Sequence, residues 1–154
     1  MIYVDADACP VRAEAESTAI RHAVPLVFVS NGGIRPSAHP LITVRYVDSG
    51  PDEADIWIAE SCGPGDVVVT ADIPLAARAV EAGALVVKPN GETLTARNVG
   101  QALAARDLAA DLRAADPFRQ GGGRPFSKQD RSRFRDALDR ALRASSSPAK
   151  GSTA

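Results

Sequence analysis

The sequence has only two cysteines, Cys9 and Cys62, and two histidines. Two thiols make neither a disulfide framework nor, by themselves, a metal-binding cluster, and Cys9 is interpreted as a buried structural residue. No apolar run reaches the roughly 18–20 residues that a membrane-spanning helix needs. Acidic residues interrupt the first apolar run at once, and no basic segment precedes it, which excludes a signal peptide. These absences predict a cytoplasmic protein with reduced thiols and no membrane partner.

Charges of both signs are present, but they are unevenly distributed. Residues 1–96 carry six Lys and Arg against thirteen Asp and Glu, whereas residues 97–143 carry eleven Lys and Arg against six Asp. An acidic first part and an arginine-rich second part suggest one region that binds a divalent cation and another that binds phosphate. The alternative is that the charges only solvate the surfaces of helices.

The pattern of apolar residues alternates between strands and helices. Runs rich in β-branched residues predict strands at residues 2–4, 25–30, 41–47, 66–70 and 84–89. Amphipathic segments predict helices at residues 13–23, within 49–66, and at 71–83, 95–115 and 128–144. Such alternation predicts an α/β fold with a mainly parallel central sheet, a three-layer sandwich with helices at the C-terminal end. We expect one domain over residues 1–143 and a disordered tail over residues 144–154, which has too little apolar content to fold.

Aspartates follow several of the predicted strands. Asp5 ends the first strand, Asp72 follows the strand at 66–70, and Asp52 and Asp55 lie in the segment after the third strand. In parallel sheets ligands bind at the carboxyl ends of the strands, so these acids should meet at one edge. An oxygen-rich pocket of this kind suits Mg²⁺ or Mn²⁺.

Helix capping is the alternative explanation for each acid taken singly. Asp7 and Asp72 precede predicted helices, and Asp52 has the spacing of a capping box with Ser49. Capping explains neither Asp55 nor Asp5. Asp7 raises a further question, because side chains two residues apart share a face of an extended strand. Either the extended geometry breaks after Asp5, or a cation lies between the two carboxylates.

The motifs VDADACP, Asp52-x-x-Asp55, VVVTADIPLA, GGGRPF and DRSRF resemble the YaiI/YqxD family of small bacterial proteins over roughly residues 1–142. That family is similar to PIN-like domains, the fold of many Mg²⁺-dependent ribonucleases and flap nucleases. The resemblance therefore implies a single PIN-like domain over residues 1–143. The YaiI/YqxD family has no established activity, so nuclease chemistry is implied by the PIN-like fold alone.

The resemblance also implies roles for particular residues. Asp5 and Asp72 match two acids of PIN-like sites, and Asp52 or Asp55 takes the place of the helix acid; the catalytic candidates are Asp5, Asp55 and Asp72. The metal ligands implied for Mg²⁺ or Mn²⁺ are Asp5, Asp7, Asp52, Asp55 and Asp72. A fourth acid found later in many PIN domains has no clear match, and Glu92 and Asp107 are the candidates.

Five residues are candidates for binding substrate: Asn31, Thr70, Arg119, Arg124 and Arg131. Thr70 is the hydroxyl neighbour of Asp72, and Asn31 lies in the turn that closes the second strand. Arg119 and Arg124 flank a glycine run whose amides could approach a phosphate, although a plain helix connector explains that run equally well. Arg131 belongs to a series of C-terminal arginines that could follow a nucleic-acid backbone. The phenylalanines between them are interpreted as anchors of the C-terminal helices.

Three functions compete. The first is an Mg²⁺- or Mn²⁺-dependent nuclease that acts on RNA or structured nucleic acid. The second is an aspartyl-phosphate phosphohydrolase using Asp5 and Asp7, but the only plausible lysine, Lys88, comes after Asp72 rather than before it. The third is a non-catalytic PIN-like module that binds nucleic acid or protein. The sequence leaves the oligomeric state open.

Overall fold

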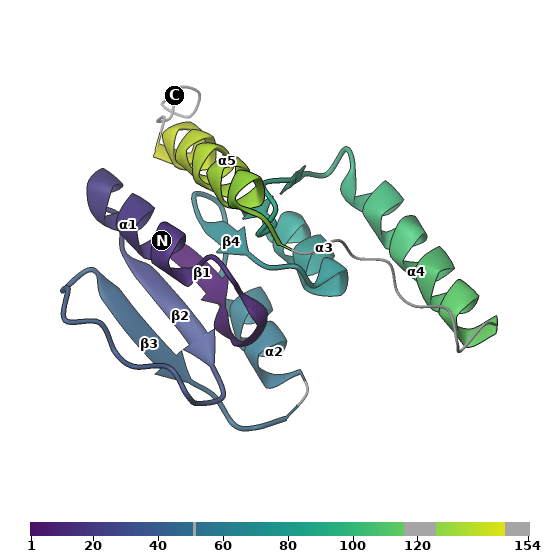
Figure 1. Ribbon diagram of the computed structural model, residues 1–154, viewed down its shortest axis with the longest axis horizontal. Coiled ribbons are helices and arrows are strands. Elements are labelled where there is room, and N and C mark those ends of the chain that lie inside the picture. Colours follow the sequence, from purple (N-terminus) through teal and green to yellow (C-terminus); the bar gives the residue numbers. More distant parts are fainter. Residues whose placement is uncertain (51, 116–125, 147–154) are drawn as a thin grey trace.

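A computed structural model describes residues 1–50, 52–115 and 126–146. Six strands form one sheet (Figure 1), and they are β1 (Ile2–Asp5), β2 (Leu26–Ser30), β3 (Ile42–Tyr46), β4 (Val67–Val69), β5 (Leu85–Val87) and β6 (Thr93–Leu94). The helical elements are the 3-10 turn η1 (Ala6–Ala8), α1 (Arg12–His22), α2 (Glu53–Ser61), α3 (Ile73–Glu81), α4 (Val99–Ala115) and α5 (Lys128–Ser146). No helix within these ranges is long and apolar enough to cross a membrane.

The sheet has the strand order β3-β2-β1-β4-β5-β6. The first five strands pair in parallel, and only β6 runs antiparallel, against β5. The predicted α/β fold with a mainly parallel sheet is therefore confirmed. The short strand β6 was not predicted, because two residues carry no detectable alternation.

Side chains that alternate along the central strands divide the core into two layers. Ile2 and Val4 of β1 face one layer, and Tyr3 faces the other. In β4, Val67 and Val69 face the first layer. The first layer is closed by residues of α1 and α5, and the second by residues of α2 and α3. This arrangement is the predicted three-layer sandwich.

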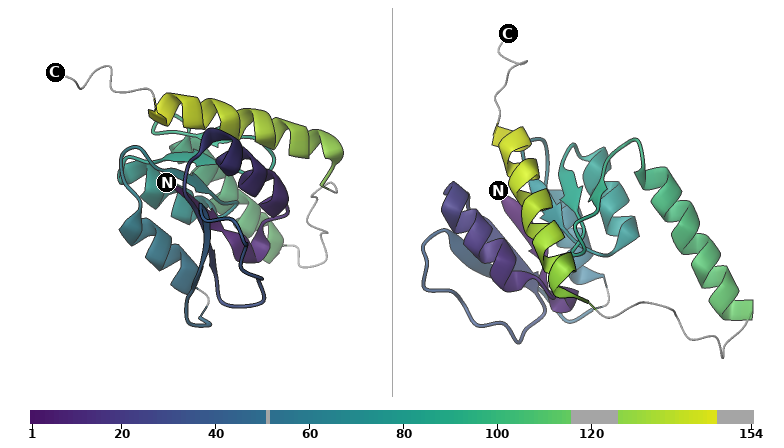
Figure 2. Two further views of the ribbon diagram at one scale, coloured as in Figure 1. Left: turned by 90° about the vertical axis from the view of Figure 1, so that its left-hand side faces the viewer. Right: turned by 45° about the horizontal axis from the view of Figure 1, so that its top comes forward.

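Helices α1 and α5 lie side by side although they are far apart in the sequence (Figure 2). Phe134 of α5 is fully buried in the first core layer, in agreement with its predicted anchoring role. At the other end of the contact, His22 Nε2 lies 2.6 Å from Asp139 Oδ1, and Arg21 also donates to this carboxylate. The hydrogen bond to His22 is the main cause that lowers the pKa of Asp139. The C-terminal helix is thus fixed onto the first helix of the chain.

Two predicted boundaries differ from the structure. Helix α5 continues to Ser146, beyond the predicted start of the tail at residue 144, and residues 147–154 lie outside the described part. Helix α4 begins at Val99 rather than at residue 95, because Asn98 and Thr95 form a turn before it in which Asn98 Oδ1 accepts from the Thr95 amide at 2.7 Å. Helix α4 packs against α3 and extends away from the sheet on that side (Figure 1).

Candidate active site

The side of the sheet on which successive strands are added switches between β1 and β4. After β1 the chain adds β2 and β3 on one side, and after β4 it adds β5 and β6 on the other. In open α/β sheets this is the position where ligands bind, at the carboxyl ends of the two strands. Asp5 is the last residue of β1, Asp72 immediately precedes α3 after β4, and Asp55 lies in the first turn of α2. We call Asp5, Asp55 and Asp72 the aspartate cluster.

The hydroxyl of Thr70 connects two members of the aspartate cluster. Thr70 Oγ1 donates to Asp5 Oδ2 at 3.1 Å and accepts from the backbone amide of Asp72 at 3.0 Å. Thr70 is only 2% exposed, so its hydroxyl positions the two acids within the protein. A direct contact between Thr70 and substrate stays a prediction.

Burial is the largest influence on Asp5, and it raises the pKa of this carboxyl group. The hydrogen bond from Thr70 acts in the opposite direction, because it favours the charged form. The negative charges of Asp72 and, more weakly, Asp7 raise the pKa further.

Asp72 serves both the cluster and helix α3. It is the N-cap residue, and its Oδ1 accepts from the backbone amide of Leu75 at 3.0 Å. The capping explanation is therefore confirmed for Asp72. Capping does not separate Asp72 from the cluster, because its carboxylate is also among the groups that raise the pKa of Asp55.

Asp55 shows the clearest electrostatic perturbation. Its pKa is raised to about 7, first by burial, then by the charge and hydrogen bond of Asp72, and then by the charges of Asp5 and Asp52. A carboxyl group next to other carboxylates holds its proton to higher pH unless a cation compensates the charge. The charged groups that shift the pKa of Asp55 are thus all carboxylates.

Asp52 lies beside the cluster, on the same helix as Asp55. It occupies the N-cap position of α2, but its side chain makes no capping hydrogen bond. The capping-box alternative is therefore wrong for Asp52. Asp52, Asp55 and Asp72 line one open cavity of about 370 Å³.

Asp7 turns away from the cluster. The 3-10 turn η1 begins directly after Asp5, so the extended geometry breaks there and Asp7 no longer shares a face with it. Ser30 Oγ donates to Asp7 Oδ1 at 2.7 Å, and the Asn31 amide donates to Asp7 Oδ2 at 3.2 Å. The structure therefore places Asp7 beside the end of β2. Its predicted role as a metal ligand gains no support from this position.

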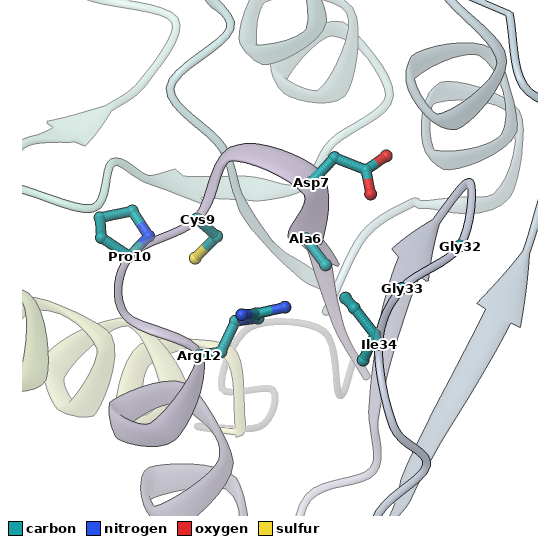
Figure 3. A pocket seen from close by; sticks show the side chains of 8 residues that line it. All are labelled: Ala6, Asp7, Cys9, Pro10, Arg12, Gly32, Gly33 and Ile34. Atoms are coloured by element: carbon teal, nitrogen blue, oxygen red, sulfur yellow. The ribbon is translucent and has the colours of Figure 1, made fainter.

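A second cavity of about 580 Å³ lies next to Asp7, between η1 and the Gly32-Gly33 turn. Figure 3 shows Arg12 and Cys9 at this cavity, with the Asp7 carboxylate pointing away from both. Burial raises the pKa of Cys9 to about 11, so its thiol stays protonated near neutral pH. The interpretation of Cys9 as a buried structural residue agrees with this environment.

The donor atoms of the cluster suit a divalent cation, but their arrangement is not that of a finished metal site. Carboxylate oxygens are the ligands that Mg²⁺ and Mn²⁺ prefer. Among the described residues, no group of three His, Cys, Asp or Glu side chains is arranged to hold a metal ion. The charge of Asp72 instead raises the pKa of Asp55. Binding of a cation by the cluster therefore requires its side chains to rearrange.

The comparison with protein families agrees with the motifs of the sequence. The family described as "Uncharacterized BCR, YaiI/YqxD family" matches residues 3–144. The chain belongs to this family. It is 68% identical over 149 residues to a UPF0178 protein of Cereibacter sphaeroides, covering 97% of the chain and 92% of that relative. It is 62% identical over 151 residues to a UPF0178 protein of Ruegeria pomeroyi, covering 97% and 98%. No solved structure matches the chain significantly.

In this YaiI/YqxD chain, the structure describes one of the three arginines predicted to bind substrate, Arg131. Arg131 donates to the Pro10 carbonyl at 2.7 Å and forms an ion pair with Glu14 at 3.2 Å. Its guanidinium group also lies over the ring of Phe126, 5.0 Å from the centroid. Arg131 thus fastens α5 to α1, and its binding of substrate stays a prediction. Arg119 and Arg124 lie outside the described residues.

Neither candidate for a fourth acid lines the cavity that contains Asp52, Asp55 and Asp72. Glu92 pairs with Lys88 at 2.9 Å in the turn between β5 and β6. Asp107 is exposed on α4 and lies 3.6 Å from Arg106. The site residues that sequence reasoning missed are Ser30, which donates to Asp7, and two arginines, Arg78 and Arg106, which line the cavity of Asp52, Asp55 and Asp72. Ser30 is the last residue of β2. The rule that ligands bind at the carboxyl ends of parallel strands, which identified the acids, could therefore have identified Ser30 as well.

The two functions of Asp72 can be separated by substitution. We expect Asp72→Ala to be less stable than Asp72→Asn by about 1 kcal/mol, because asparagine retains the N-cap acceptor and alanine does not. Urea denaturation of both variants at neutral pH measures this difference. Equal stability of the two variants would contradict a contribution of the cap.

Proposed function

We propose that this chain is an Mg²⁺- or Mn²⁺-dependent nuclease that hydrolyses phosphodiester bonds of RNA or structured nucleic acid. The observation that carries the proposal is the convergence of Asp5, Asp55 and Asp72 from three different elements. They meet at the sheet position where α/β folds bind ligands. Divalent cations bound there would polarise a phosphoryl oxygen and activate a water molecule.

The residues of the chain have distinct tasks in this proposal. Asp5 and Asp72 supply two carboxylates, and the Thr70 hydroxyl holds the Asp5 carboxylate and the backbone amide of Asp72. Asp55 supplies a third carboxylate from α2, and Asp52 extends the acidic surface of the same cavity. The sequence VVVTADIPLA, with Thr70 and Asp72 after a buried strand and before a helix, supports assignment to the PIN-like superfamily.

A non-catalytic PIN-like module that binds nucleic acid or protein is the second candidate. The observation in its favour is that the described residues contain no three-ligand group ready to hold a metal ion. The phosphohydrolase alternative is weaker, because Asp5 and Asp7 make separate hydrogen bonds, to Thr70 and to Ser30. That chemistry needs the two carboxyl groups to act together on one phosphate.

Titration calorimetry with Mg²⁺ and with Mn²⁺ tests the proposal, combined with cleavage of single-stranded RNA in the presence of each cation and in EDTA. We expect the native protein to bind at least one cation and to cleave RNA only when that cation is present. Asp136→Asn on the exposed surface of α5 is the matched control. A native protein that binds neither cation would favour the non-catalytic module.

A further inference from the structure

The cavity beside the aspartate cluster also carries two arginines. It lies between the first turns of α2 and α3 and is closed by α4, and its charged lining residues are Asp52, Asp55, Asp72, Arg78 and Arg106. Carboxylates and guanidinium groups thus line one open cavity of about 370 Å³. The volume is that of a small ligand site, large enough for one nucleotide of a strand.

The fold explains why both arginines reach this cavity. Arg78 lies one helical turn after Pro74 on α3, and residues four apart share a helix face. Arg106 comes from α4, which packs against α3 and therefore brings its middle turns close to the start of that helix. Neither position has a signal in the sequence, because each arginine alone looks like ordinary surface charge.

Neither guanidinium group is committed to a strong partner. Within the part of the chain that the structure describes, Arg78 has no ion pair. Among the described residues, the ion pair of Arg106 is with its neighbour Asp107, at 3.6 Å, and both side chains are more than half exposed. Exposed pairs of this kind contribute little, so Arg106 can exchange Asp107 for a better partner.

A phosphodiester group matches both the arginines and the aspartates that line the cavity. Its oxygens match the planar fork of arginine, and a cation held by the aspartates faces the same oxygens from the other side. We propose that Arg78 and Arg106 bind a phosphodiester group of a single-stranded nucleic acid next to the bond that is cleaved. This inference rests on the proposed function, and it names the residues that hold the substrate there. The arginines predicted from the sequence to bind substrate include neither Arg78 nor Arg106.

Fluorescence anisotropy of the full chain with labelled single-stranded RNA, and with DNA of the same sequence, tests the inference. The measurement is made in Ca²⁺, with the strands checked on a gel for integrity. We expect Arg78→Gln and Arg106→Gln each to raise Kd about tenfold, as for loss of a charged hydrogen bond. The slope of log K against log salt should become shallower by roughly 0.7 for each arginine removed.

Arg35→Gln in the loop between β2 and β3 is the matched control, because Arg35 is exposed and does not line the cavity. Its Kd and salt slope should equal those of the native protein. RNA and DNA should lose affinity by the same factor, since the contact is to phosphate, and a loss confined to RNA would overturn the inference. Unchanged Kd in the double variant Arg78→Gln/Arg106→Gln, or no strand binding by the native protein, would overturn it as well.

The two proposals can fail separately. Calorimetry of the arginine variants should show the same cation affinity as the native protein. If cation affinity falls in these variants, the arginines act by holding the aspartates and the inference is overturned. If the native protein binds strands through the arginines but neither binds a cation nor cleaves, the inference stands and the nuclease proposal fails.

Discussion

Asp5→Asn is expected to lower the rate of cation-dependent cleavage by about 10³-fold, the size of effect seen when one preorganised charged or polar group is removed from an active site. Asparagine has the same shape, and its carbonyl oxygen still accepts the hydrogen bond that Thr70 donates to Asp5 Oδ2. The substitution therefore removes the negative charge and leaves the local geometry in place. Single-turnover cleavage of a labelled RNA strand measures the effect.

Two controls make this expected result specific. Asp136→Asn removes the same charge from the exposed surface of α5 and should retain the native rate. Thermal unfolding of Asp5→Asn should show a folded protein, because burial already disfavours the charged form of Asp5. A folded Asp5→Asn variant that cleaves at the native rate would exclude Asp5 from the chemistry.

Asp55→Asn is expected to make the cation-free protein more stable by about 1–2 kcal/mol at pH 8, after allowance for the partial exposure of the side chain. The native carboxyl group must ionise there beside Asp72 and Asp5, whereas the amide has no charge to repel. Residues that are placed for function often lower stability, and their replacement then raises it.

The sign of the pH dependence follows from the direction of the shift. The pKa of Asp55 is about 7 in the folded chain, above the ordinary value of 3.8. Between these two pH values the folded state holds a proton that the unfolded state has released, so stability falls as pH rises. The penalty is fully developed above about pH 7. The advantage of Asp55→Asn should thus be largest at pH 8 and vanish near pH 4.

Urea denaturation of the native protein and Asp55→Asn across this pH range, in EDTA, measures the effect. Asp136→Asn should show no such pH-dependent difference from the native protein. Adding Mn²⁺ at pH 8 should stabilise the native protein by mass action and leave Asp55→Asn nearly unchanged. Identical pH profiles for the native protein and Asp55→Asn would contradict the crowding of carboxylates described above.

Much of the fold could be predicted because its signals are local. The β-branched runs that became β2 and β4 are short, apolar and bounded by turn residues, so the sequence alone locates them. Parallel strands place their carboxyl ends at one edge, and this rule was sufficient to bring Asp5 and Asp72 together. Asp55 could be predicted to join them because it lies on a helix in the segment after the third strand, three residues after Asp52.

The remaining features depend on geometry that no local pattern contains. The side chain of Asp7 does not share a face with that of Asp5, because a 3-10 turn follows Asp5. The alternation of side chains along a strand does not extend through such a turn. The role of Arg131 depends on α5 crossing α1, a contact between residues more than a hundred positions apart. Arg78 reaches the aspartates from α3 itself, whereas Arg106 meets them only because α4 packs on α3.

The hydrogen bond between Thr70 and Asp5 joins residues 65 positions apart. Closing so long a loop is entropically unfavourable and occurs only when the strands between have already paired. The aspartate cluster therefore does not exist in an unfolded or half-assembled chain, where its mutual repulsion is also absent. Its assembly coincides with the completion of the sheet, so a nascent or damaged chain carries the acids without the site.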